Sequence, residues 1–106
     1  MGRGIAGVIL STVGNAYETA RAGGKHGGWY RIYREHGERQ LERSIRSFEA
    51  LIREHQANIA NPFLKLPRDT EPKRVRDLVE NGWPEDIQRH GEFIEILQGI
   101  MRERRK

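Results

Sequence analysis

The chain contains no cysteine among its 106 residues. This absence excludes disulfide bonds, thiolate nucleophiles and cysteine-based zinc sites, and it leaves the redox compartment undetermined. Long apolar runs are lacking as well. The stretch GIAGVILSTVG at residues 4–14 has about eleven residues, whereas a helix needs about 20 to cross a membrane. We therefore expect no membrane span.

Several catalytic signatures are also missing. The glycines around Lys25 do not match the phosphate-binding pattern G-x-x-x-x-G-K-[ST], and neither H-E-x-x-H nor another strong metal-ligand spacing occurs. Ser44 and Ser47 lack the sharp-turn context of a serine nucleophile. Strand-like alternation and internal repeats are absent too, so we expect an all-α protein. Because the motifs above are missing, we also expect no metal and no cofactor.

The residues that are present suit one soluble helical domain of basic character. Lys and Arg number 19 against 15 Asp and Glu, which gives a formal net charge of +4. Polyanions are the natural partners of such a surface. Basic residues crowd the C-terminus at 102, 104, 105 and 106. They form either a solvated helix end or a contact to a polyanion.

Hydrophobic spacing predicts two long amphipathic helices, over about 38–60 and 84–104. Apolar or imidazole side chains recur at steps of three and four residues. In the first helix these are Leu41, Ile45, Phe48, Ile52, His55 and Ile59, and in the second Ile87, His90, Ile94, Leu97 and Met101. We expect the two helices to pack antiparallel.

Weaker signals predict shorter helices over about 5–20, 29–36 and 71–80. Gly37 closes the second of these, while Thr70 caps the third and Asn81 with Gly82 ends it. Between the first two, four glycines within six residues break the pattern. This division predicts an apolar leader and glycine-rich linker at 1–24, followed by a helical effector domain at 25–106.

The histidines are the main candidates for chemistry. His55 and His90 both lie on apolar faces, where the ordinary role of a histidine is a hydrogen-bonded core residue. If the long helices are antiparallel, however, the two imidazoles meet at one end of their interface. Paired imidazoles can act as base and acid in cleaving a phosphodiester, without a metal.

The segment GGKHGGWY at residues 23–30 adds a second group of candidates. Lys25 and His26 can act on a phosphate there, while Trp29 and Tyr30 either stack on a base or seal a core. The candidate catalytic residues are thus His26, His55, His90, Lys25 and Glu54. The candidate substrate-binding residues are Arg46, Arg53, Arg89, Trp29, Tyr30 and Asn58.

Three blocks, GKHGGWY, SIRSFEALIREHQANIANP and WPEDIQRHGEFIEILQGIM, resemble a C-terminal module of bacterial polymorphic toxins. These include Rhs-type and filamentous-haemagglutinin-type proteins of contact-dependent competition, and the resemblance covers about residues 24–103. It implies a delivered effector, commonly a nuclease, that a cognate immunity protein blocks in the producing cell. The matching positions are Lys25, His26, Ser47, Glu54, His55, Asn58, Trp83, Asp86 and Arg89. The chain differs from the toxins in its own initial methionine and apolar leader.

The leading hypothesis is therefore a small basic antibacterial toxin domain that acts as a metal-independent ribonuclease in the cytoplasm of a target bacterium. Its expected partners are RNA, including transfer RNA, and an immunity protein. The alternative is a basic helical module without enzymatic activity that binds nucleic acid or a protein partner. A third interpretation is an assembly domain whose apolar leader docks on a partner.

Overall fold

The computed structural model describes residues 16–105, and this part of the chain contains helices and no strand. Residues 16–21 are helical and lie at the start of the described chain. The remaining elements are α2 (Gly27–Tyr33), α3 (Glu38–Ala60), the 3₁₀ turn η1 (Pro62–Leu64), α4 (Pro72–Asp77), the π-helical turn η2 (Leu78–Gly82) and α5 (Trp83–Arg104). The predicted all-α class is confirmed.

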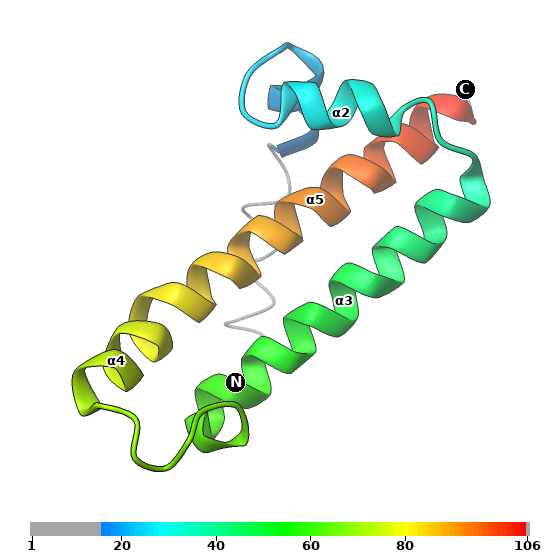
Figure 1. The fold of residues 1–106 in the computed structure, drawn as a ribbon. Helices are drawn as coiled ribbons and strands as arrows, with labels where there is room; N and C mark the ends of the chain where they lie inside the picture. Colours follow the sequence, from blue (N-terminus) through cyan, green and yellow to red (C-terminus); the bar gives the residue numbers. More distant parts are fainter. Residues whose placement is uncertain (1–15, 106) are drawn as a thin grey trace, which may run out of the picture.

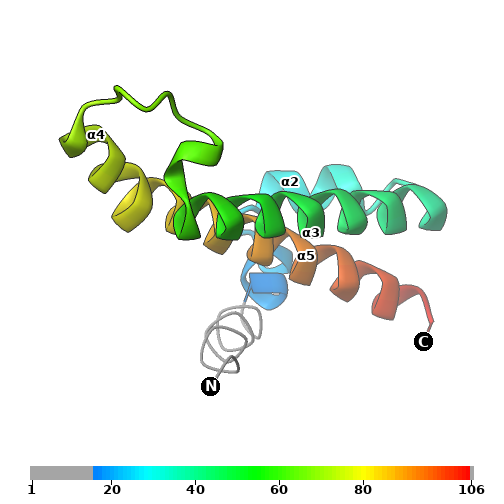
Figure 2. The same ribbon diagram turned by 90° about the horizontal axis from the view of Figure 1, so that it is seen from below.

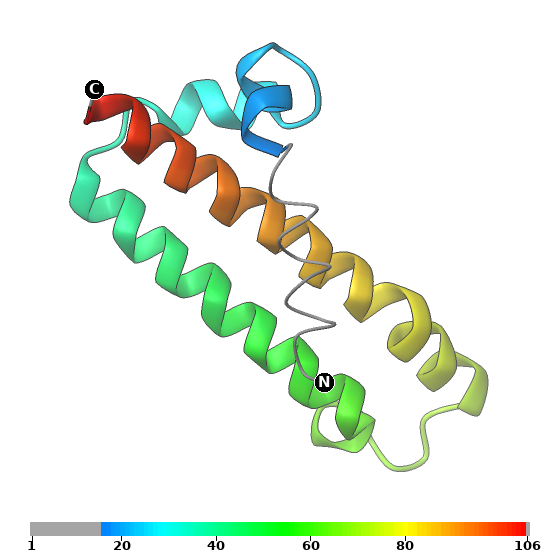
Figure 3. The same ribbon diagram turned by 180° about the vertical axis from the view of Figure 1, so that it is seen from behind.

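The two long helices, α3 and α5, lie side by side and run in opposite directions (Figures 1 and 3). At one end, the Arg104 guanidinium near the end of α5 donates hydrogen bonds to the carbonyls of Arg34 and His36, just before α3 begins. At the other end, His55 of α3 faces Asp86 in the first turn of α5. The resulting body is elongated, at 52 × 26 × 25 Å.

The face of α3 that contacts α5 is the one that the hydrophobic spacing predicts. Leu41 and Ile52 are buried there, and Phe48 packs against the same core. On α5, Leu97 and Met101 are buried as well. Removing such side chains from water is worth roughly 1.5–3 kcal/mol each, so this interface is a main source of stability.

Helix α2 and the helical residues 16–21 (blue in Figure 2) cover further parts of α5, and Trp29 of α2 also lies near Phe48 of α3. Tyr17, Ala20 and Tyr30 join the core from these two segments. The Tyr17 ring packs directly on Gly99, where a Cβ atom would overlap with it. Tyr17 and Ala20, in the segment assigned above to a leader and linker, therefore belong to the core.

Several predicted helix boundaries are wrong in detail. The short helix expected at 29–36 begins at Gly27 and ends at Tyr33. Asn81 and Gly82 do not end a helix, because Gly82 has helical φ and ψ of −60° and −56° and the chain passes through η2 directly into α5. The helix expected at 5–20 is helical at 16–20, and its residues 5–15 lie outside the described residues.

The expected cap of α4 is also wrong. The Thr70 hydroxyl donates to the carbonyl of Pro67 at 2.6 Å instead of capping α4. Glu71 occupies the N-cap position, and Pro72 begins the helix as the sequence suggests. As for membrane insertion, none of the helices in residues 16–105 has the length and apolarity that crossing a bilayer demands.

Candidate active site

The glycine-rich segment before α2 holds His26 in an unusual backbone conformation. His26 is the N-cap residue of α2 and has φ 67° and ψ 16°, in the left-handed region. This conformation costs a residue with a side chain roughly 1–2 kcal/mol relative to a right-handed one. Such strain persists only where surrounding contacts maintain it, and it is frequent at functional sites. His26 therefore has a fixed position, although the sequence alone suggests that this segment is a linker.

The contact that holds His26 is a buried carboxylate on α5. His26 Nε2 lies 2.8 Å from Glu92 Oε1, and Lys25 Nζ lies 3.2 Å from the same oxygen. Gln88 Nε2 donates to Glu92 Oε2 at 3.0 Å. Burial raises the pKa of the Glu92 carboxyl, but the hydrogen bonds from His26, Gln88 and Lys25 outweigh burial and hold this pKa below its usual value. Glu92 is therefore a carboxylate at neutral pH.

This arrangement prepares the imidazole for proton transfer. When Nε2 of His26 carries the proton and donates it to Glu92, the lone pair is on Nδ1, which can then act as a base. The ring also packs edge-on against Phe93, with 4.8 Å between ring centroids. Glu92 and Phe93 together fix the orientation of the His26 ring.

A pocket of about 420 Å³ opens beside this cluster. Its lining residues are Lys25, His26, Glu80, Asn81, Pro84, Glu85, Gln88, Arg89 and Glu92. Arg89 is half exposed, and its guanidinium donates to Asp86 Oδ1 at 2.8 Å. The pocket, called the His26 pocket below, therefore brings one imidazole together with an ammonium group, a guanidinium group and the carboxylates of three glutamates.

His55 and His90 meet at the interface of α3 and α5, with 5.6 Å between ring centroids. His90 also stacks on Phe48, and His55 Nε2 lies 3.4 Å from Asp86 Oδ2. Burial, the Arg89 charge and His55 lower the pKa of His90. The Nδ1 atoms of both rings are buried without a hydrogen-bond partner. This histidine pair is therefore a largely buried feature of the interface.

The three candidate histidines do not form one site. Positions 90 and 92 differ by about 200° around α5, so His90 and Glu92 point to opposite sides of the helix. His26 contacts the Glu92 side, and neither His55 nor His90 lines the His26 pocket. The fold therefore does not bring His26 and His55 together as an acid and base pair.

Trp29 and Tyr30 seal the core and offer no stacking surface for a base. The Trp29 ring is sandwiched between Tyr33 at 4.0 Å and Phe93 at 4.3 Å, nearly parallel to both. Tyr30 is only 4% exposed, and its hydroxyl donates to Glu103 Oε2 at 2.6 Å. Of the two roles that the sequence allows for these rings, the structural one is correct.

Other candidates on α3 lie away from the pocket. Arg46, Arg53 and Glu54 are exposed and lie about 120° or more from the stripe that faces α5. Asn58 is buried, at 5% exposure, and so cannot reach a substrate. Of the positions named only by the resemblance, Ser47 is exposed, Trp83 is buried and Asp86 binds Arg89.

Glu92 is the residue that the sequence analysis missed. It lies within the apolar stretch GEFIEILQGI, where an acid at a buried position requires a partner. Gln88, four residues earlier, is on the same helix face and was a further signal. Neither signal identifies His26 as the partner, because 66 residues separate the two side chains.

Among residues 16–105, no group of three His, Asp or Glu side chains is placed to hold a metal ion. The chain matches no known family model, no curated protein sequence and no solved structure.

Proposed function

We propose that this chain is a ribonuclease that cleaves RNA without a metal in the His26 pocket. The observation that carries the proposal is the 2.8 Å contact of His26 with the buried Glu92, in a pocket that Lys25 and Arg89 also line. An imidazole that a carboxylate orients, with cations beside it, is the equipment that phosphodiester transesterification needs.

In this proposal, His26 Nδ1 removes the proton of a ribose 2′-hydroxyl. The 2′-oxygen then forms a bond to phosphorus, and the bond from phosphorus to the 5′-oxygen breaks. Arg89 and Lys25 neutralise the charge that develops on the phosphoryl oxygens. The Lys25 ammonium protonates the leaving 5′-oxygen. Afterwards His26 releases its extra proton to water and Lys25 takes one up from water, so both groups return to their starting states. Glu92 stabilises the imidazolium that forms on His26.

The biological setting of the proposal comes from the resemblance to polymorphic toxins. A ribonuclease delivered into the cytoplasm of a competing bacterium meets its substrates, transfer RNA included, directly after entry. The producing cell then needs an immunity protein that covers the pocket.

The test compares three purified proteins on total bacterial RNA in the presence of EDTA. Wild type is expected to cleave RNA, and His26→Asn to lose at least about a hundredfold in rate, the usual contribution of a general base. Asparagine is chosen because it tolerates the left-handed backbone of position 26. His36→Asn is the matched control, because His36 contacts Tyr33 and lies outside the pocket.

Circular dichroism checks that all three proteins are equally helical. Intact RNA with wild-type protein would refute the proposal and leave the basic binding module as the better explanation. Equal activity of His26→Asn and wild type would refute the assigned role of His26.

A further inference from the structure

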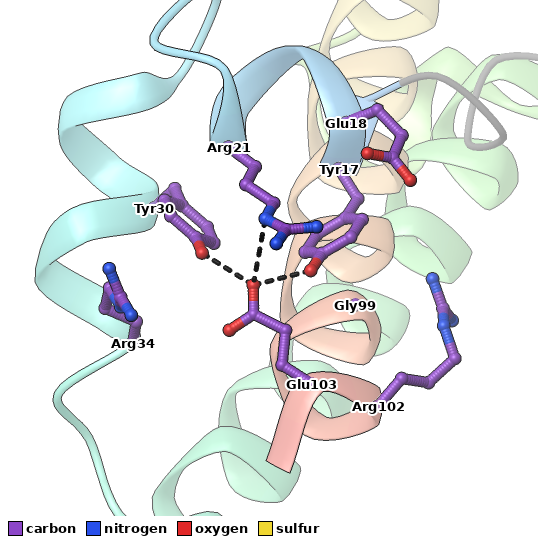
Figure 4. A pocket seen from close by; sticks show the side chains of 8 residues that line it. All are labelled: Tyr17, Glu18, Arg21, Tyr30, Arg34, Gly99, Arg102 and Glu103. Atoms are coloured by element: carbon purple, nitrogen blue, oxygen red, sulfur yellow. Dashed lines mark hydrogen bonds and ion pairs between the residues drawn. The ribbon is translucent and has the colours of Figure 1, made fainter. Parts of the chain in front are cut away.

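A second pocket, of about 690 Å³, lies at the C-terminal end of α5 (Figure 4). Its lining residues are Tyr17, Glu18, Arg21, Tyr30, Arg34, Gly99, Arg102 and Glu103. The hydroxyls of Tyr17 and Tyr30 donate to Glu103 Oε2 at 2.5 and 2.6 Å. We call it the arginine pocket, because three guanidinium groups surround it.

The three arginines are held in place, but most of their hydrogen-bond donors have no close acceptor among the described residues. Arg34 lies over the Tyr30 ring and Arg102 over the Tyr17 ring, at 5.6 and 5.7 Å from the ring centroids. The ion pairs of Arg21 with Glu103 and of Arg102 with Glu95 are both 3.9 Å long, beyond hydrogen-bond distance. Within residues 16–105, these guanidinium groups therefore keep donors free for another acceptor.

Glu18 and Glu103 offset only part of this positive charge, because three guanidinium groups line the pocket with two carboxylates. One oxygen of Glu103 already accepts two tyrosine hydroxyls, so this carboxylate is engaged by the floor of the pocket. In Figure 4, Arg34 and Arg102 lie on opposite sides of Glu103, and Arg21 approaches it from above. The three arginines line one pocket from different sides, and the guanidinium group is suited to the oxygens of a phosphate group.

The position of the arginine pocket relates it to the His26 pocket. Glu103 follows Glu92 by 11 residues, which is three helical turns and about 20°. The two carboxylates therefore lie on nearly the same face of α5, about 16 Å apart along the axis. One extended RNA strand can contact both pockets.

We infer that the arginine pocket binds a backbone phosphate of the RNA whose scissile bond lies in the His26 pocket. This inference rests on the proposed ribonuclease function and specifies its substrate. The protein requires a single-stranded segment that extends several nucleotides from the cleavage point, and a dinucleotide is a poor substrate because it reaches only one pocket. Backbone contacts of this kind position a strand without reading its sequence.

The binding experiment uses a fluorescent single-stranded RNA in which every 2′-hydroxyl is methylated. Such a strand cannot undergo the transesterification, so affinity is measured by fluorescence anisotropy whether or not the protein cleaves RNA. The pocket variant carries Arg21→Gln, Arg34→Gln and Arg102→Gln. The control variant carries Arg43→Gln, Arg46→Gln and Arg53→Gln, which remove the same charge from exposed positions of α3.

We expect the pocket variant to bind at least tenfold more weakly than the control variant in 0.1 M salt, a buffer of about physiological strength, with a smaller dependence of affinity on salt. Equal weakening of both variants overturns the inference, because only the total charge would then matter. If the triple variant is not helical by circular dichroism, Arg102→Gln alone, at an exposed side chain, is compared with Arg46→Gln. Here we expect Arg102→Gln to bind the strand about threefold more weakly than Arg46→Gln. Equal affinities of these two variants would overturn the inference.

Two further arms separate this inference from the proposed function and from a small-anion site. If wild type binds the methylated strand through the three arginines but cleaves no RNA, the ribonuclease proposal fails and the phosphate site stands. If the arginine variants bind the strand as the control does, while inorganic phosphate still binds to wild type, the pocket is a site for small anions and the inference is wrong.

Discussion

Glu103 should contribute a large part of the stability of this protein, because it joins the N-terminal part of the described chain to α5. Its Oε2 accepts hydrogen bonds from Tyr17 at 2.5 Å and Tyr30 at 2.6 Å. Hydrogen bonds to a charged group contribute about 1.5–3 kcal/mol each. Both donors share one oxygen of a half-buried carboxylate, so the lower value applies to each. Glu103→Ala should therefore lower the free energy of unfolding by about 3 kcal/mol.

That loss is a large fraction of the 5–15 kcal/mol typical of a small domain. The assay is urea unfolding at pH 7, followed by the helical circular dichroism signal. Glu103→Gln should lose about half as much, because its amide oxygen still accepts hydrogen bonds. A double-mutant cycle with Tyr17→Phe measures the coupling of the pair. A coupling energy below about 0.5 kcal/mol would refute the reasoning.

The same contact predicts a dependence on alkaline pH. Burial, the hydrogen bond to Glu103 and the carboxylate charge raise the pKa of Tyr17 from 10.0 to about 12. The neutral phenol is therefore favoured in the folded protein. Its stabilising contribution is complete below pH 10, the value in the unfolded chain, and is lost as the pH rises through about 12. In Glu103→Gln, tyrosinate absorbance should appear at lower pH than in wild type, and coinciding titrations would contradict this.

Two further predictions concern the packing around Gly99 and the loss of stability at acidic pH. Gly99→Ala should lower the free energy of unfolding by about 1–3 kcal/mol, because the added methyl overlaps with the Tyr17 ring, whereas Gly37→Ala, with open space around it, should change it by less than about 1 kcal/mol. Equal urea midpoints for the two variants would contradict this packing. His90 has a lowered pKa, so the unfolded chain binds a proton below pH 6.5 while the folded protein does not. Its contribution is therefore complete above pH 6.5 and is lost as the pH falls toward the lowered value. The free energy of unfolding should decrease over this pH range in wild type, and it should decrease less in His90→Gln. Parallel pH profiles of the two proteins would contradict this role of His90.

The sequence predicts the two long helices well because their stability depends on a repeated pattern. Six positions of α3 and five of α5 recur at helical spacing, so errors at single residues average out. Asn81 and Gly82 show the opposite case. Local propensity favours a helix end there, but η2 keeps the backbone helical and leads directly into α5. The Trp83 N–H donates to the Leu78 carbonyl across these two residues, so the backbone stays helical against their local propensity.

The candidate site was less predictable, because its key partner is distant in sequence. Lys25 and His26 could be selected from their chemistry and their glycine neighbours. Glu92 could not be paired with them, since the pairing depends on how α2 docks on α5. Trp29 illustrates the same difficulty, because its spacing fits both a stacking surface and a core residue. Only its position between Tyr33 and Phe93 distinguishes the two.

Docking of α2 connects the fold of this protein to its proposed chemistry. Tyr30 follows His26 by one turn of α2, and each is held by an acid of α5, Glu103 and Glu92 respectively. The bond between Tyr30 and Glu103 therefore restricts the position of the His26 ring, although the two acids lie about 16 Å apart. Glu92 can orient the His26 imidazole only when α2 is docked on α5, because the two side chains come from these two helices. The strained backbone of His26 and the stability of the core thus depend on the same interface.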